Sequence, residues 1–296
     1  MRNDRLSGVG VALVTPFNED GAVDYPALEK LLDYIINGGI DYIVVSGTTG
    51  EPSTMTAGEK REMRKFIVDK VAGRVTLVLG IGGNNTKAVI DEIKSTDLTG
   101  FNSILSISPY YTKPTQRGIY AHFAEIAKAS PLPIILYNVP GRTGRGMDAA
   151  TIVKLANDFN NIVAVKEASG NMDHIMAVLQ NMPEDFMLIS GDDSLTVPMI
   201  SLGCCGVISV AANVVPVQFC NMINKALRGE FKEASRIHFQ LLDLMDALFE
   251  DGSPSGAKAA LAELGIMKEI LRLPLVDVCG NTRIHIKEAL KKALKA

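Results

Sequence analysis

The chain of 296 residues contains no tryptophan and only four cysteines. No two cysteines have C-x-x-C spacing, and the four histidines are scattered singly. The sequence therefore offers neither a disulfide framework nor the close ligand spacing of a zinc site, and we predict that no metal is bound. Cys204 and Cys205 lie in a hydrophobic run, where free cysteine is expected to be a small buried residue.

The sequence also lacks a charge excess and a long hydrophobic run. Lysine and arginine total 30 against 33 aspartate and glutamate residues, a formal net charge of -3, which gives no sign of binding to nucleic acid or to an anionic membrane. No run approaches the roughly 18 hydrophobic residues that a membrane span needs. Residues 1–5 are followed by glycine and polar residues rather than by a long hydrophobic stretch, so no signal peptide is expected. We expect a cytoplasmic protein that acts on a small molecule.

Eight short hydrophobic runs, rich in β-branched residues, recur along the chain. They lie at 9–14, 41–45, 75–81, 102–107, 133–137, 162–166, 186–190 and 206–210. The segments between them have helical periodicity. The first helical segment is expected to begin after an N-cap at Asp24 and to end at Gly38, and the second opens with a capping box from Thr56 to Glu59.

Hydrophobic runs without polar alternation indicate strands that are covered on both faces, and the alternation of strands with helices implies parallel pairing. Eight such units favour an α/β fold of the (β/α)8 TIM barrel type over an open doubly wound sheet, which is the alternative. We predict a catalytic barrel at 1–229, followed at 230–296 by a C-terminal helical extension. Three helices are expected in this extension, around 241–248, 258–264 and 284–295.

The active site of such a barrel is built from the loops that follow the C-terminal ends of the strands. Lys166 closes the sixth hydrophobic run, which places its amine at the mouth of a dry barrel. Desolvation disfavours the charged form of a lysine in such a place, and a neutral lysine amine can form a Schiff base with a ketone. The alternative is an ordinary lysine paired with Glu167 or with another neighbouring carboxylate.

Neutral hydroxyl groups occur at three other strand ends. Thr48 and Thr49 follow the second run, Tyr111 follows the fourth, and Tyr137 ends the fifth. Hydroxyl groups both donate and accept protons, which suits imine formation, although each tyrosine taken alone would more often be a core aromatic residue. The glycines at 80, 82 and 83 do not complete a dinucleotide-binding motif because Asn85 takes its last position, so a tight turn is predicted there.

The order and spacing of these motifs resemble one family over nearly the whole chain. It is the family of pyruvate-dependent class I aldolases that includes N-acetylneuraminate lyase and dihydrodipicolinate synthase. The matching segments are TPF at 15–17, GTTGE at 47–51, PYY at 109–111, YNVPGRTG at 137–144, KEASGN at 166–171, SGDD at 190–193 and GVISV at 206–210. Thr48, Thr49 and Arg142 are similar to the synthase branch, because the lyase branch usually has Ser-Thr and lacks that arginine.

The resemblance implies four catalytic residues. Lys166 resembles the lysine that captures pyruvate as a Schiff base, and Tyr137 resembles the residue that donates and accepts protons during imine formation and cyclisation. Thr48 and Tyr111 resemble the remaining members of a hydroxyl relay to bulk water. In the family this second tyrosine reaches into the site of a neighbouring subunit, so Tyr111 is expected to do the same here.

The resemblance also implies four substrate-binding residues. Thr49 resembles the site for the pyruvate carboxylate, and Gly191 and Ile208 offer carbonyl groups near the bound substrate. Arg142 resembles the clamp for the carboxylate of the second substrate, a task that suits the planar fork of donors on a guanidinium group.

The implied reaction joins pyruvate to L-aspartate 4-semialdehyde and gives 4-hydroxy-tetrahydrodipicolinate, on the lysine and diaminopimelate pathway. No cofactor is implied, because the lysine itself serves as the electron sink. The family also implies a homotetramer built as a dimer of dimers. Two alternatives are an aldolase of the same family that acts on N-acetylneuraminate or a 2-keto-3-deoxy sugar acid, and a non-catalytic barrel that senses a keto acid.

Feedback inhibition by L-lysine is expected to be weak or absent. In lysine-sensitive family members, the effector site matches positions 52, 53, 60, 84, 88 and 110 of this chain. Asn84 and Tyr110 are retained, but Lys60 stands where sensitive enzymes typically have a histidine, and Ala88 stands where they have a glutamate. Pro52 replaces a small residue and removes a backbone donor. The ammonium group of the effector would therefore lose its counter-charge.

Overall fold

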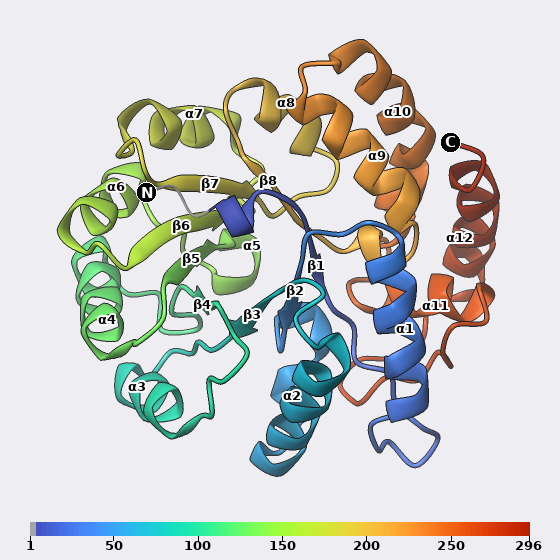
Figure 1. The fold of residues 1–296 in the computed structure, drawn as a ribbon, viewed down its shortest axis with the longest axis horizontal. Helices are drawn as coiled ribbons and strands as arrows, with labels where there is room; N and C mark the ends of the chain where they lie inside the picture. The colour runs from blue at the N-terminus through green and yellow to red at the C-terminus, as the bar shows by residue number, and fades with distance from the viewer. Residues whose placement is uncertain (1–3) are drawn as a thin grey trace.

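The computed structural model describes residues 4–296, and eight parallel strands close into a barrel in chain order (Figure 1). The strands are β1 (Gly8–Ala12), β2 (Tyr42–Val45), β3 (Thr76–Gly80), β4 (Ser103–Ile107), β5 (Ile134–Asn138), β6 (Ile162–Glu167), β7 (Met187–Ser190) and β8 (Gly206–Ser209). Each predicted run coincides with one strand to within two residues. The predicted (β/α)8 barrel is confirmed, and the alternative of an open doubly wound sheet is wrong.

The strands are mainly hydrophobic because both faces of the barrel are buried. One hydrophobic cluster fills the barrel interior and another lies between the strands and the surrounding helices. Along β6, Ala164 belongs to the inner cluster and Val165 to the outer one. Because side chains of a strand alternate between faces, Lys166 points into the barrel and Glu167 points away from it.

Helices surround the barrel in Figure 1, and their predicted start signals are present. They are α1 (Tyr25–Asn37), α2 (Ala57–Val71), α3 (Thr86–Ser95), α4 (Gln116–Ala129), α6 (Ala149–Asp158), α7 (Met172–Asn181), α8 (Thr196–Ser201) and α9 (Pro216–Leu227). The Asp24 side chain accepts from the N–H of Ala27 at the start of α1. Thr56 and Glu59 form the predicted capping box of α2.

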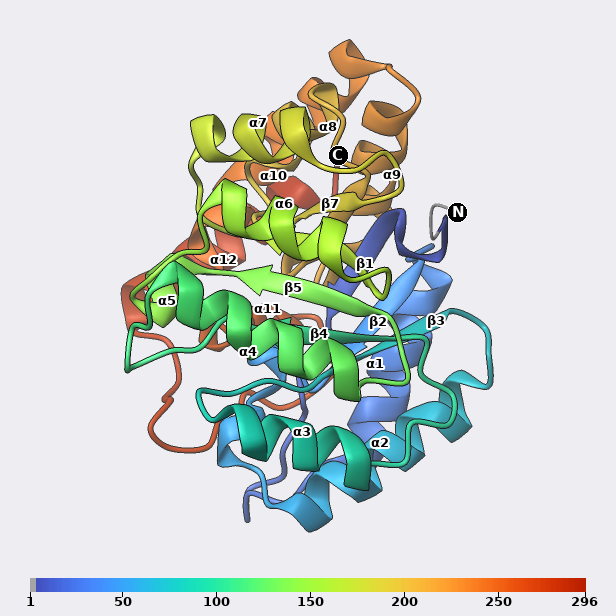
Figure 2. The ribbon, with the colours of Figure 1, turned by 90° about the vertical axis from the view of Figure 1, so that its left-hand side faces the viewer.

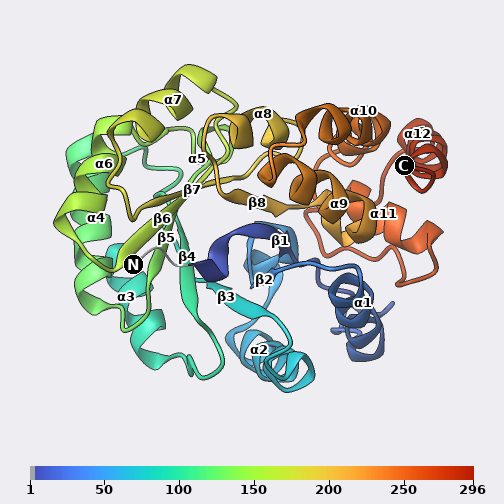
Figure 3. The same ribbon diagram turned by 45° about the horizontal axis from the view of Figure 1, so that its top comes forward.

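Three further helices follow the barrel, as predicted: α10 (Phe231–Ala247), α11 (Ser255–Glu263) and α12 (Gly280–Ala293). Figure 3 shows them gathered beside α9 and α1. Helix α10 packs on α9 and α12, and α12 packs on α11. The predicted boundary between residues 229 and 230 lies in the turn between α9 and α10. The division of the chain into two domains at this boundary stays a prediction.

The C-terminal ends of all eight strands lie at one end of the barrel. In Figure 2, β5 points toward the short helix α5 (Pro140–Thr143), and the connection between α11 and α12 lies at the same end. The glycines at 80, 82 and 83 lie at the end of β3 and directly after it, and the chain there forms no hydrogen-bonded turn before a bend at Asn84, so the predicted tight turn is not found. A Cβ atom on Gly80 would lie 2.3 Å from the carbonyl oxygen of Ser46, so only glycine fits there.

Several smaller predictions can be compared with the described residues. Cys204 and Cys205 are buried, as predicted. No helix within residues 4–296 is both long enough and apolar enough to cross a membrane. The interpretation of the N-terminus as polar and without a signal peptide concerns residues 1–5, of which 1–3 lie outside the described part.

Candidate functional site

Lys166 and Tyr137 lie next to each other at the C-terminal ends of neighbouring strands. The two residues are partners in the parallel register of β5 and β6. The Lys166 Nζ atom lies 4.4 Å from the centroid of the Tyr137 ring. Both residues are only 7% exposed, so the amine lies over the aromatic ring and both side chains are largely shielded from solvent.

The alternative in which Lys166 pairs with Glu167 is wrong. Glu167 Oε2 accepts from Asn138 Nδ2 at 2.8 Å and lies 3.2 Å from His174 Nε2, and Oε1 accepts from the N–H of Ser169 at 2.8 Å. The hydrogen bond that His174 donates to the Glu167 carboxylate raises the pKa of His174. Within residues 4–296, no hydrogen bond or ion pair engages the Lys166 amine, so it is available to a substrate.

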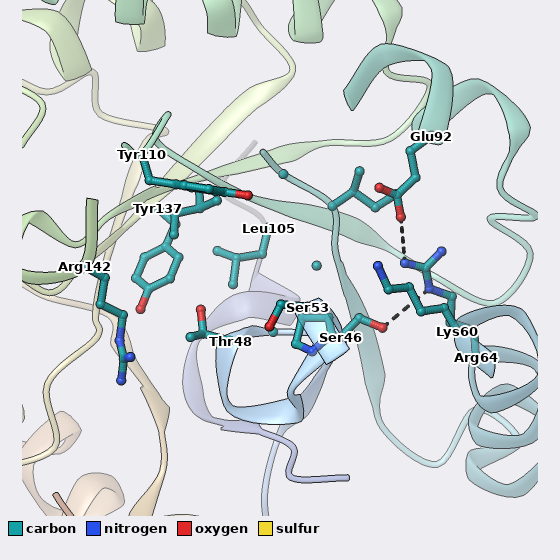
Figure 4. Close-up of a pocket in the computed structure, with 16 residues that line it drawn as sticks. Ser46, Thr48, Ser53, Lys60, Arg64, Glu92, Leu105, Tyr110, Tyr137 and Arg142 are labelled. Atoms are coloured by element: carbon teal, nitrogen blue, oxygen red, sulfur yellow. Dashed lines mark hydrogen bonds and ion pairs between the residues drawn. The ribbon is translucent and has the colours of Figure 1, made fainter. Parts of the chain in front are cut away.

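One cavity of about 530 Å³ brings six of the eight predicted site residues together. These six residues come from four different strand ends or the loops after them: Thr48, Thr49, Tyr137, Arg142, Lys166 and Gly191. A second cavity of about 390 Å³ adjoins the first, because Thr48, Tyr137 and Arg142 line both. Figure 4 shows the Tyr137 hydroxyl pointing toward the part of the second cavity that Thr48 and Arg142 border.

Arg142 lies on α5, whose first residue, Pro140, suits the start of a helix because its missing N–H needs no partner there. The side chain of Arg142 is exposed to the cavities. Its guanidinium group makes no hydrogen bond or ion pair with any residue between 4 and 296. Five free donors therefore face a space that also holds the Lys166 amine, which is an arrangement suited to an anionic substrate.

Gly191 follows β7 and touches the predicted nucleophile. A Cβ atom at this position would lie 3.0 Å from Cε of Lys166, 2.7 Å from Cβ of Ala168 and 3.1 Å from the carbonyl oxygen of Glu167. The N–H of Gly191 donates to that carbonyl at 2.7 Å. Glycine thus allows the β7 end to approach the lysine side chain closely, and it leaves room for the amine to move.

Two predicted residues do not line the cavity. Ile208 is 1% exposed and belongs to the cluster inside the barrel, where it pairs with Gly10 of β1. Tyr111 is 87% exposed, and its backbone has a φ of 70°, a left-handed conformation that is uncommon for a bulky residue. Within one chain, Tyr111 is therefore not part of the site.

The structure adds residues to the cavity that the sequence reasoning did not single out. They come from the β7 and β8 ends and from the C-terminal extension: Asp192, Asp193, Ser194, Val210, Met245, Asp246, Phe249, Glu250 and Ser253. The motif SGDD could have pointed to the first two. No sequence signal distinguishes Met245, because it also fits the hydrophobic face of α10.

Asp193 is the buried carboxyl group of this added set. Its Oδ2 atom accepts from the N–H groups of Val210 and Ala211, at 3.1 Å and 2.8 Å. Desolvation by burial outweighs these hydrogen bonds and raises the pKa of Asp193 from 3.8 to about 6. The folded protein therefore binds this proton more tightly than the unfolded chain does.

This pKa shift predicts a pH-dependent effect of Asp193→Asn. Because the folded-state pKa is raised, the wild-type protein loses stability as the pH rises from about 4 to about 6, whereas the neutral amide does not. We expect the variant to gain on the order of 2 kcal/mol of unfolding free energy relative to wild type between pH 4 and pH 8. Urea unfolding at several pH values measures this difference. A difference between the two proteins that is constant over that range would contradict the prediction.

Within residues 4–296, no three His, Cys, Asp or Glu side chains are grouped closely enough to hold a metal ion. The chemical groups that the cavity does bring together are an amine, neutral hydroxyls and a guanidinium group. An amine can attack a carbonyl carbon, hydroxyls can transfer protons, and a guanidinium group can bind a carboxylate. The site is therefore suited to covalent chemistry on a keto acid.

Known proteins resemble the chain over its full length. Residues 5–293 match the dihydrodipicolinate synthetase family. The 4-hydroxy-tetrahydrodipicolinate synthase of Azobacteroides pseudotrichonymphae is 51% identical and is aligned over 98% of both chains. A dihydrodipicolinate synthase from Cyanidioschyzon merolae, solved with lysine bound, is 42% identical with a TM-score of 0.94 and covers 99% of each chain. The enzyme from Acinetobacter baumannii, solved with pyruvate, is 37% identical with a TM-score of 0.94, covering 97% of this chain and 99% of that one.

These similarities confirm the predicted enzyme class, a lyase of the class I aldolase type, and the predicted activity, that of a 4-hydroxy-tetrahydrodipicolinate synthase. They extend from the N-terminal strand through the last helix, so they cover the barrel, the site and the extension together. The chain belongs to the dihydrodipicolinate synthetase family.

Proposed function

We propose that the enzyme joins pyruvate to L-aspartate 4-semialdehyde through a Schiff base on Lys166. The observation that carries this proposal is a buried amine without an ion-pair partner, in contact with a tyrosine ring, in a cavity that also holds a free guanidinium group. Relatives that share the fold include one solved with pyruvate, which supports the first substrate.

The first half of the reaction activates pyruvate. The Lys166 amine attacks the keto carbon, and loss of water gives an imine whose positive charge makes the methyl protons acidic. Tyr137 and Thr48 are assigned the proton transfers, because both hydroxyls belong to the same cavity as the amine. Thr49 and the carbonyl group of Gly191 are assigned to binding the captured pyruvate, because both residues line the cavity, whereas Ile208 does not line it and is given no such role. Loss of a methyl proton then yields an enamine, which is the carbon nucleophile.

The second half of the reaction forms the carbon–carbon bond. The enamine carbon adds to the aldehyde carbon of the semialdehyde, whose oxygen takes up a proton to become a hydroxyl. The amine of the second substrate then attacks the imine carbon, closes the ring and displaces Lys166. Arg142 is assigned to the carboxylate of the second substrate, because its guanidinium group faces the cavity without a partner in the chain.

A coupled assay tests this assignment against the other aldolase reactions of the family. We expect the purified enzyme to consume pyruvate and aspartate semialdehyde, with product reduced by an added dihydrodipicolinate reductase, at a kcat in the range of about 1 to 10³ s⁻¹. N-acetylneuraminate and 2-keto-3-deoxygluconate cleavage are measured beside it. Faster cleavage of either sugar acid than condensation would overturn the proposed substrates.

We also propose that the active form is at least a dimer, assembled into a homotetramer of two dimers. Tyr111 is 87% exposed and the adjacent Tyr110 is 39% exposed, so the isolated chain leaves two aromatic rings uncovered beside the cavity. If a neighbouring subunit covers these two rings, Tyr111 reaches into the active site of that neighbouring subunit. Sedimentation of the wild-type protein, compared with Tyr111→Asp, measures whether this surface holds subunits together.

Feedback inhibition by L-lysine is predicted to be weak or absent. Pro52, Lys60 and Tyr110 line one cavity, and Figure 4 shows Lys60 beside Arg64 in it. The carboxylate of Glu92 is already paired with Arg64 at 3.0 Å. A bound lysine ammonium would thus meet the Lys60 ammonium without a free carboxylate from Glu92 to balance it. At an effective dielectric near 20, two unit charges about 4 Å apart repel by roughly 4 kcal/mol before screening.

Initial rates with increasing L-lysine decide whether the effector site survives. We expect less than half inhibition at about 1 mM, a concentration that corresponds to a binding free energy of only about 4 kcal/mol. The control is D-lysine at the same ionic strength. Half inhibition by the L-isomer well below that concentration would show that the cavity accepts a second ammonium group, and that this prediction is wrong.

A further inference from the structure

A buried ion pair joins the C-terminal extension to the loop that carries Thr48 and Thr49. Lys258 lies on α11, and its Nζ atom is 2.5 Å from Oε1 of Glu51, with both side chains completely shielded from solvent. The same amine donates to the carbonyl oxygen of Ile270 at 2.8 Å. Burial lowers the pKa of Lys258 to about 8, although the nearby Glu51 carboxylate opposes that change.

Glu51 is the residue at which the loop leaves the active site. It directly follows the single turn η2 (Thr48–Gly50), and its own N–H donates to the carbonyl oxygen of Thr48 at 3.2 Å. Its backbone is left-handed, with φ 55° and ψ 40°, a conformation that residues other than glycine seldom adopt. Such a conformation persists only where the surroundings hold it, and the contacts of the Glu51 carboxylate add to the hydrogen bond that Thr15 donates to the carbonyl oxygen of Gly50 in the same turn.

Arg272, in the connection between α11 and α12, holds the other side of this carboxylate. The main-chain N–H of Arg272 donates to Oε2 of Glu51 at 3.2 Å. The guanidinium group donates to the carbonyl oxygen of Thr54 at 2.9 Å, pairs with Glu59 at the start of α2, and lies 4.4 Å from the centroid of the Phe17 ring. Both oxygens of Glu51 are therefore held by residues that lie beyond the barrel in the sequence.

We infer that Glu51 and Lys258 are positioning residues, through which the C-terminal extension sets the position of Thr48 and Thr49 beside Lys166. This inference rests on the proposed function, because it assigns the two threonines to proton transfer and pyruvate binding. Neither Glu51 nor Lys258 lines the cavity, so they act on the reaction only through the loop. A displacement of about 1 Å in a reacting group can lower a rate by up to about 10²-fold.

The inference predicts different results for stability and for catalysis. Glu51→Gln keeps an oxygen that can accept from Arg272 but removes the charge that attracts Lys258. The folded variant is expected to lose at least about tenfold in kcat and to raise the KM for pyruvate, because the threonines are no longer held in place. Lys258→Met, of similar length, leaves the carboxylate buried without its cation and is expected to have the lower melting temperature of the two.

Three comparisons separate positioning from general stability. The double variant Glu51→Gln, Lys258→Met contains no unpaired buried charge, so we expect it to recover thermal stability relative to Lys258→Met while its kcat stays low. Ile286 is a completely buried residue of α12, so Ile286→Ala leaves a cavity. This variant should lower the melting temperature without changing kcat at 25 °C. If Glu51→Gln is folded and keeps the wild-type kcat and KM, or if the double variant recovers full activity, the inference is wrong.

Labelling with pyruvate and borohydride distinguishes failure of this inference from failure of the proposed function. Wild-type protein that does not label on Lys166 would contradict the proposed function itself. Wild-type protein that labels, together with a Glu51→Gln variant that labels at the wild-type rate and turns over normally, would contradict only the inference. The expected result is a wild-type protein that labels and a Glu51→Gln variant that labels at least several-fold more slowly.

Discussion

Replacing Lys166 with alanine is expected to lower kcat by on the order of 10³-fold or more while the protein stays folded. The amine is assigned the covalent step, and no other amine of the described chain lines the cavity of about 530 Å³. Lys166 makes no ion pair within residues 4–296, so its loss leaves no buried carboxylate without a partner. Stability should therefore change much less than activity.

The coupled assay and a thermal melt measure the two effects on Lys166→Ala. Lys232→Ala is the control, because that lysine is exposed on α10 and outside the cavity. We expect the control to keep the wild-type rate. Residual activity of Lys166→Ala within about tenfold of wild type would mean that the reaction does not depend on an imine at this position.

Replacing Arg142 with alanine is expected to weaken use of aspartate semialdehyde while pyruvate capture continues. A charge-assisted bidentate contact is worth about 2 to 3 kcal/mol, which corresponds to about 30- to 150-fold in kcat/KM for the second substrate. Arg142→Lys should recover only part of this loss, because an ammonium group lacks the planar fork of donors.

Arg145→Ala is the matched control for Arg142. Arg145 is also exposed and lies three residues away, but it does not line either cavity. We expect it to leave both substrates unaffected. If Arg142→Ala prevents pyruvate labelling as strongly as it prevents condensation, the guanidinium group does not act on the second substrate alone and the assignment must be revised.

The barrel could be predicted because its local signals and its packing agree. Strands that are buried on both faces need hydrophobic residues at most positions, so continuous hydrophobic runs predict them. Asp24, Thr56 and Glu59 mark the starts of two helices by hydrogen bonds to residues nearby in the sequence. Lys166 could be identified for a similar reason. A lysine at the end of such a run must enter the barrel mouth, and the structure places it there at 7% exposure.

The rest of the site depends on contacts between distant parts of the chain. Met245 and Phe249 border the cavity only because α10 and the residue that follows it closely pack against the barrel. In the sequence, Met245 already fits the hydrophobic face of α10, so nothing there marks it as a cavity residue. The ion pair of Glu51 with Lys258 joins two segments that share no local pattern. The role expected of Tyr111 also depends on a distant contact, because it requires a second subunit and cannot be tested in a single chain.

The most direct test of the central claim is reduction of the enzyme with borohydride in the presence of pyruvate, followed by peptide mass spectrometry. An imine is reducible and an amine is not, so the experiment reports the covalent intermediate itself. The account predicts one reduced pyruvyl group per chain, located on Lys166, and none in Lys166→Ala or without pyruvate. An adduct on a different lysine, or an unmodified wild-type protein, would contradict it.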